Sequence, residues 1–90
     1  MTGSEFIKLR TVSVGEGSME LYFTVKKTTP LRKLKRSYSE SKGVGVASLR
    51  FFFNGFRISD ADTAEGVGLT EKDTIYVYAG LGSNTRLVES

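Results

Sequence analysis

The sequence contains no cysteine, no histidine and no tryptophan, and only one of its 90 residues is proline. Without thiols or imidazoles, the chain offers no disulfide, no zinc-finger or haem ligand set, no cysteine nucleophile and no Ser-His-Asp triad. It also lacks a phosphate-cradling Gly-Lys motif and a metal-ligand cluster. We therefore expect a protein that is not an enzyme and that uses no cofactor and no metal.

Long apolar segments are absent as well. No run of about 18 apolar residues exists, and the first residues lack the basic-then-apolar order of a signal peptide. The missing cysteines fit any compartment. A chain of this size buries roughly two-thirds of its unfolded surface, which is enough to hold one core. We expect a single soluble, intracellular domain that does not engage membranes.

Acidic residues are scarce in the middle of the chain. Between residues 21 and 42, Glu40 is the one acidic residue among seven basic ones. Such a block attracts nucleic acid, an anionic membrane surface or an acidic peptide, but a solvated helix face explains it equally well. Nucleic acid is a minor alternative, because no aromatic residues interleave with these lysines. The basic residues are Lys26, Lys27, Arg32, Lys33, Lys35, Arg36 and Lys42.

The first half of the chain alternates apolar and polar residues around a glycine-rich turn. Residues 6–14 and 19–26 follow a period of two, which predicts two strands joined in a hairpin. A helix is predicted over 30–42, with the Thr29 hydroxyl as N-cap and Pro30 as the first helical residue. Its apolar face carries Leu31, Leu34 and Tyr38.

The second half predicts three more strands, at 49–53, 56–58 and 74–78. Asn54-Gly55 is a tight-turn signal between the first two, and residues 60–68 are predicted as a loop with one helical turn. Alternation places Leu49, Phe51, Phe53, Ile75 and Val77 inside, and Arg50, Phe52, Tyr76 and Tyr78 outside. The element order predicts an α+β fold in which one main helix packs on one face of a mixed sheet.

Two strings occurring together resemble the small ubiquitin-like modifiers, the SUMO family. One is Leu49-Arg50-Phe51-Phe52-Phe53-Asn54-Gly55, and the other is the helical Leu31-Arg32-Lys33-Leu34-Lys35-Arg36-Ser37-Tyr38. The resemblance covers residues 6–78 and implies a ubiquitin-like β-grasp fold. We expect a SUMO-like domain over residues 6–79, a flexible leader or cloning remnant over 1–5 and a flexible tail over 80–90.

The resemblance also implies a peptide-binding groove between the second strand and the helix. In this family the groove accepts a hydrophobic-acidic motif as an added β-strand, and the family implies a nuclear or nucleocytoplasmic location. A second strand at the sheet edge would leave backbone groups for such pairing, with Lys35 or Arg36 as further cations at the rim. Core packing and solubility are the alternative roles of these residues. The expected groove residues are Leu21, Phe23, Val25, Lys26, Lys33, Leu34 and Ser37.

Two features depart from the family. No adjacent pair of glycines follows Tyr78, so we do not expect this chain to be conjugated through its C-terminus. The first loop, Val14 to Gly17, is longer than usual, and outward aromatic residues predict a second protein-binding surface. These features favour the alternative of a diverged or engineered binding protein on the SUMO scaffold, which binds a specific partner through the aromatic surface, the long first loop and the C-terminal tail. Cross-strand pairing explains the aromatics too. The residues of that surface are Phe52, Tyr76 and Tyr78, with Phe56 at its margin.

Overall fold

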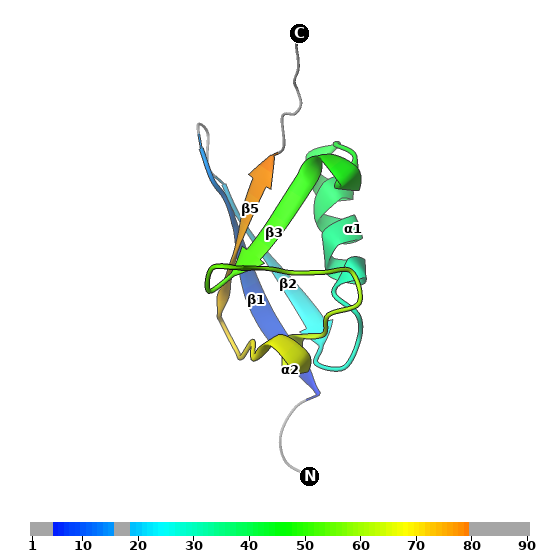
Figure 1. Cartoon of the computed structure of the whole chain (residues 1–90), viewed down its shortest axis with the longest axis vertical. Coiled ribbons are helices and arrows are strands. Elements are labelled where there is room, and N and C mark those ends of the chain that lie inside the picture. Colours follow the sequence, from blue (N-terminus) through cyan, green and yellow to red (C-terminus); the bar gives the residue numbers. More distant parts are fainter. Residues whose placement is uncertain (1–4, 16–18, 80–90) are drawn as a thin grey trace, which may run out of the picture.

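The computed structural model describes residues 5–15 and 19–79, so the expectations for 1–4, for the middle of the first loop and for 80–90 lie outside the described residues. One mixed sheet is covered on one face by a single main helix, which is a ubiquitin-like β-grasp (Figure 1). The predicted fold class is confirmed. The elements are β1 (Phe6–Ser13), β2 (Glu20–Lys26), α1 (Arg32–Lys42), the 3-10 turn η1 (Val46–Ser48), β3 (Leu49–Phe53), β4 (Phe56–Arg57), α2 (Ala64–Val67) and β5 (Thr74–Ala79).

The strand order β2-β1-β5-β3-β4 places the last strand of the chain at the centre of the sheet and β2 at an edge. β5 runs parallel to β1 and antiparallel to β3. Asn54 and Gly55 adopt φ angles of 55° and 85°, the left-handed geometry of a two-residue hairpin turn. That turn closes β3 onto β4 with Phe53 opposite Phe56.

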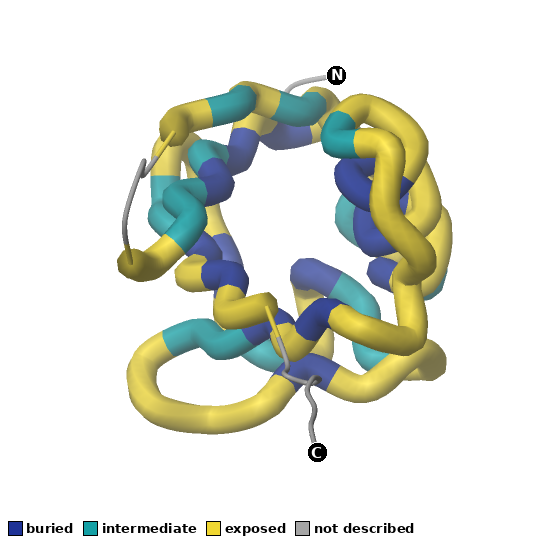
Figure 2. The backbone as a smooth tube through the Cα atoms, turned by 90° about the horizontal axis from the view of Figure 1, so that it is seen from above, coloured by how far each residue is buried: buried dark blue, intermediate teal, exposed yellow. Residues whose placement is uncertain are grey.

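The core lies between α1 and the sheet, where the buried segments of the backbone face one another (Figure 2). The Tyr38 ring meets the Phe51 ring edge to face, with centroids 5.5 Å apart. Burial raises the pKa of the Tyr38 phenol. Thr11 is fully buried, and its hydroxyl donates to the Leu21 carbonyl at 3.0 Å, so that its polar atom is satisfied.

The start of α1 differs from the prediction. The helix begins at Arg32 with Leu31 as N-cap, and no side chain caps it. Instead, the Leu31 amide donates to the Asp62 carbonyl at 2.7 Å and the Arg32 amide to the Asp60 carbonyl at 3.2 Å. The predicted N-cap at Thr29 was wrong because a distant loop satisfies the first helical donors, which no local sequence signal indicates.

The segment between β4 and α2 crosses to α1, and Lys35 holds it there (Figure 1). The Lys35 ammonium donates to the Ile58 carbonyl at 2.6 Å and to an Asp60 carboxylate oxygen at 2.9 Å. Asp60 thereby acquires a lowered pKa, chiefly through this hydrogen bond and the Lys35 charge. Among the described residues, no helix has the length and apolar character needed to cross a membrane.

Candidate functional site

The open edge of β2 supplies backbone groups for pairing. The Ser13 amide donates to the Met19 carbonyl at 3.1 Å, and the Lys27 amide to the Glu5 carbonyl at 2.7 Å. In an antiparallel ladder, alternate residues direct both backbone polar groups toward the partner strand. With the observed register, Leu21, Phe23 and Val25 face β1, whereas Glu20, Tyr22, Thr24 and Lys26 direct their backbone groups to the open edge.

A groove of about 320 Å³ lies between this edge and α1. It brings together six of the seven groove residues expected from the sequence, and Leu21 is the one that does not line it. Sequence reasoning missed several others, although Phe6 could have been found because it lies opposite Lys26 in the hairpin. The lining consists of Phe6, Phe23, Thr24, Val25, Lys26, Thr29, Pro30, Lys33, Leu34 and Ser37.

The floor of the groove is apolar and continuous with the core. Leu34 is 3% exposed, so it forms the base of the groove and serves packing as well. Phe23 and Val25 are half-buried and pack against the core cluster. The centroid of the Phe23 ring lies 6.3 Å from that of the buried Tyr38 ring, so Phe23 connects the groove to the core. The groove therefore offers an apolar surface whose position is fixed by core residues.

The rim of the groove is basic. Lys33 and Ser37 are exposed, one helical turn apart on the flank of α1 that lines the groove. Lys26 lies opposite, with its ammonium 3.5 Å from a Glu5 carboxylate oxygen. Lys35, expected at this rim, is buried and directed to the other flank of α1, so that expectation was wrong. Arg36 also lies away from the groove and lines a separate cleft.

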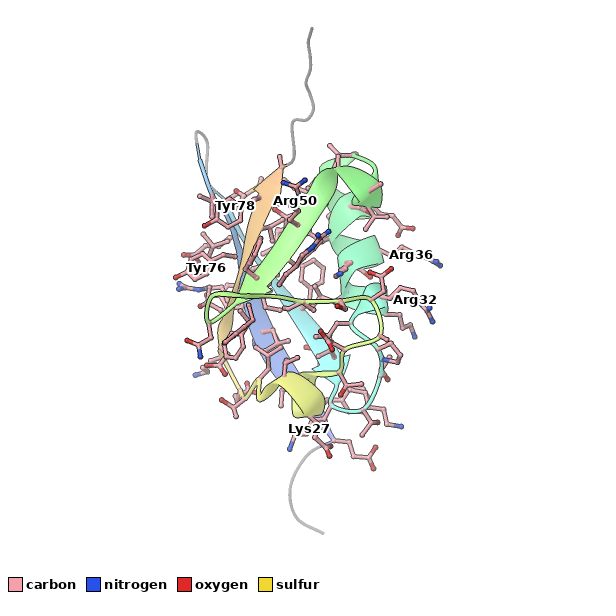
Figure 3. All side chains as sticks on the ribbon, viewed as in Figure 1. Lys27, Arg32, Arg36, Arg50, Tyr76 and Tyr78 are labelled. Carbon is pink, nitrogen blue, oxygen red and sulfur yellow. The ribbon has the colours of Figure 1, made fainter. Side chains whose placement is uncertain are left out.

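The opposite face of the sheet carries exposed aromatic side chains. Tyr76 and Tyr78 are each 44% exposed on the central strand and point away from α1 (Figure 3). The Phe52 ring meets the Tyr78 ring edge to face at 5.3 Å. Phe56 lies opposite Phe53 in the hairpin and therefore belongs to the helix-side face, so its expected place at the margin of this surface was wrong.

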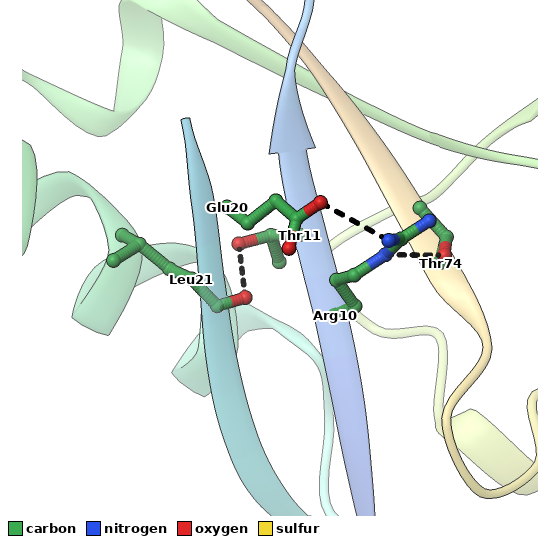
Figure 4. A network of polar contacts seen from close by, with 5 residues as sticks. All are labelled: Arg10, Thr11, Glu20, Leu21 and Thr74. Atoms are coloured by element: carbon green, nitrogen blue, oxygen red, sulfur yellow. Dashed lines mark hydrogen bonds and ion pairs between the residues drawn. The ribbon is translucent and has the colours of Figure 1, made fainter. Parts of the chain in front are cut away.

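A polar network borders the aromatic surface. The Arg10 guanidinium donates to a Glu20 carboxylate oxygen at 3.1 Å and to the Thr74 hydroxyl at 3.0 Å, which links β1 to both neighbouring strands (Figure 4). The groups are partly exposed, so the ion pair contributes at most about 1 kcal/mol. Its main effect is to fix Arg10 on this face. Among the described residues, no three carboxylates gather in a way that could hold a metal ion.

Comparison with known proteins agrees with the observed fold. A structure titled Caldiarchaeum Subterraneum Ubiquitin superposes with a TM-score of 0.78, over 94% of this chain and 99% of that chain. Its sequence identity of 18% makes this a likeness of fold. Residues 11–78 match the family model described as ubiquitin-2 like Rad60 SUMO-like. The chain therefore belongs to the ubiquitin-2 like Rad60 SUMO-like family.

Proposed function

We propose that this SUMO-like domain is a non-catalytic interaction module that binds a hydrophobic-acidic peptide by β-strand addition at β2. The observation that carries the proposal is the coincidence of an open strand edge, an apolar floor and a basic rim in one groove. Each feature alone is common on small domains. Together they match an extended peptide: its backbone pairs with the open strand edge, its aliphatic side chains contact the apolar floor, and its acidic residues face the basic rim.

The backbone pattern supports a peptide strand beside Tyr22 and Thr24. Both residues direct an amide and a carbonyl to the open edge. A peptide strand paired there alternates its side chains, so every second residue faces Phe23, Val25 and Leu34. Aliphatic side chains at those positions gain about 25 cal/mol for each Å² of apolar surface removed from water.

The charge pattern supports an acidic flank. Lys33 forms no ion pair within the described residues, and the Lys26–Glu5 contact is exposed and weak. Acidic residues of a peptide can therefore pair with both ammonium groups at little cost to the domain. Attraction of this kind accelerates association and decreases with salt.

The test is the double variant Phe23→Ala, Lys33→Glu, measured by calorimetric titration with a peptide of four aliphatic residues followed by an acidic run. The variant removes part of the floor and reverses a rim charge, so we expect affinity to fall at least about tenfold, or 1.4 kcal/mol. Tyr76→Ala, on the other face of the sheet, is the control and keeps wild-type affinity. Unchanged affinity in a folded double variant would contradict the proposal.

A second candidate function uses the aromatic surface formed by Phe52, Tyr76 and Tyr78 to bind another protein. It is favoured by the exposure of both tyrosines on the sheet face that is covered by no helix of the described residues. Tyrosine and phenylalanine give large contact area at a low cost in side-chain entropy. Tyr76→Ala is expected to abolish binding of such a partner and to leave the groove peptide unaffected. Loss of every ligand through the groove variant alone would assign the aromatics to sheet packing.

A further inference from the structure

The two flanks of α1 carry different basic residues. Lys33 and Ser37 line the peptide groove, whereas Arg32 and Arg36, also one turn apart, line a second cleft of about 480 Å³ on the other flank. Arg57 of β4 pairs with Phe52 in the hairpin, yet it lines the same cleft and its charge acts on Asp60. Five of the seven residues of the basic block thus lie outside the groove, and the groove does not explain them. The cleft residues are Arg32, Lys35, Arg36, Val46, Ala47, Leu49, Arg57 and Asp60.

Positive charge in this cleft exceeds negative charge. The Lys35 ammonium donates to the Ile58 carbonyl and to Asp60, whose carboxylate is the acidic group of the cleft lining. Within the described residues, the side chains of Arg32, Arg36 and Arg57 form no direct ion pair or hydrogen bond, but the charges of Arg32 and Arg57 both act on the Asp60 carboxylate. Like charges one helical turn apart destabilise a helix slightly. An anion in the cleft would turn this repulsion into attraction.

The chemistry of the lining indicates which anion fits. A guanidinium presents a planar pair of N–H donors that matches the oxygens of a phosphate, unlike the compact ammonium of lysine. Val46, Ala47 and Leu49 add an apolar wall from η1 and the start of β3, and Val46 is 43% exposed. The cleft therefore combines an accessible apolar surface with three guanidinium groups, none of which is in a direct ion pair within the described residues.

We propose that this cleft binds a phosphate monoester carried on a small apolar group, the chemistry of a phosphorylated side chain of a partner protein. Arg32 and Arg36 approach the phosphate from α1 and Arg57 approaches it from β4, while the apolar group contacts Val46 and Ala47. Asp60 opposes the ligand charge. The site lies on the flank of α1 away from the groove and does not rest on the proposed peptide function.

The experiment is an amide-resolved NMR titration of the full chain with phenyl phosphate, inorganic phosphate and phenyl sulfate. We expect saturating shifts at Arg32, Arg36, Val46 and Arg57, with phenyl phosphate binding more tightly than inorganic phosphate. Its affinity should rise from pH 5 to pH 7 as the second phosphate proton, with a pKa of about 6, is lost, whereas phenyl sulfate should show no such rise. Shifts spread over all basic residues without saturation would overturn the proposal.

Variants separate this cleft from the groove. Arg32→Gln and Arg57→Gln change exposed residues, and each should weaken phenyl phosphate binding about threefold to tenfold. Lys33→Gln, adjacent on the helix but lining the groove, is the matched control and should leave it unchanged. Asp60→Asn should tighten binding. A larger loss in Lys33→Gln than in Arg32→Gln would place the anion in the groove and contradict the site.

A last titration tests whether the phosphate group is carried by a protein side chain. A short peptide containing phosphotyrosine should shift the same cleft amides as phenyl phosphate, and its unphosphorylated form should not. If phenyl phosphate binds the cleft but the phosphopeptide is excluded, the assignment to a protein side chain is wrong.

Discussion

At the scale of single residues, the Lys35 ammonium illustrates how a charge can serve packing. Its stem crosses the core edge, its ammonium lies 5.7 Å from the centroid of the Phe51 ring, and its hydrogen bonds fix the loop that also caps α1. Lys33, two positions earlier, is exposed at the groove. Residues of the same type in one helix therefore have different roles because they face different neighbours.

Lys35→Met tests this role. The methionine can follow the same path but leaves the Ile58 carbonyl and the Asp60 carboxylate without their donor. We expect the free energy of unfolding to fall by about 1–3 kcal/mol in urea denaturation. Lys33→Met, at an exposed position, should stay within about 0.5 kcal/mol of wild type. Equal effects of both substitutions would mean that the Lys35 contacts contribute no stability.

The Asp60 carboxyl also links stability to pH. Its pKa is lowered from 3.8 in the folded domain by Lys35, so this group stabilises the fold above its unfolded pKa. That stabilisation is lost as the pH falls through the lowered value. The stability difference between wild type and Asp60→Asn, measured by thermal unfolding, should therefore shrink as the pH falls from 5 toward 2. A difference that grows on acidification would contradict this linkage.

At the scale of elements, the hairpin turn at Asn54 and Gly55 sets the register of β4 against β3 and so determines on which side of the sheet each β4 side chain lies. Gly55 has a φ of 85°, and a Cβ there would meet open space, so the cost of Gly55→Ala is backbone strain alone. We expect a loss of about 1–2 kcal/mol in urea denaturation. Gly45→Ala is the matched control, because Gly45 has a φ of −73° and equally open surroundings, and it should be neutral or stabilising. Similar losses at both positions would argue against strain at Gly55.

The open edge of β2 determines which amides of a bound peptide are needed for pairing. A peptide paired with β2 directs alternate amides toward Tyr22 and Thr24. N-methylation of those peptide amides should abolish binding, and N-methylation of the intervening ones should leave affinity within about threefold. The measurement is a calorimetric series of singly methylated peptides. Losses that do not alternate along the peptide would exclude β-strand addition.

At the scale of the whole molecule, most of the fold could be predicted from the sequence because each strand alternates cleanly and each turn has its own residues. The predictions were wrong where a distant part of the chain determines the local structure. Asp60 and Asp62 cap α1 through backbone carbonyls, which leaves Thr29 without that role. The direction of Lys35 depends on the same loop, and the face of Phe56 depends on turn geometry.

The candidate groove was largely predictable for a related reason. Alternation along β2 and helical spacing along α1 each identify one wall, and the sheet order then places the two walls together. Sequence patterns could not identify the cleft at Arg32, Arg36 and Arg57. These residues come from two elements that are brought together by the crossing of the β4–α2 segment.

The 90-residue chain carries a net charge of +3, so salt should distinguish electrostatic from apolar contributions to peptide binding. We expect affinity for the hydrophobic-acidic peptide to fall as salt rises from 50 to about 500 mM, because the rim lysines are exposed and screened. A peptide with glutamines in place of its acidic run should bind more weakly and vary little with salt. Equal salt dependence of both peptides would mean that the rim lysines do not contribute to peptide binding.

If the β2 edge and α1 form one peptide-binding groove, a bound peptide must perturb both elements together. The measurement is amide-resolved NMR of the labelled domain titrated with the peptide of four aliphatic residues and an acidic run. We expect saturating shifts centred on residues 21–26 and 31–38, with the largest at the Tyr22 and Thr24 amides that face the open edge. A folded domain without shifts in either segment, or with shifts confined to Tyr76 and Tyr78, would contradict this groove.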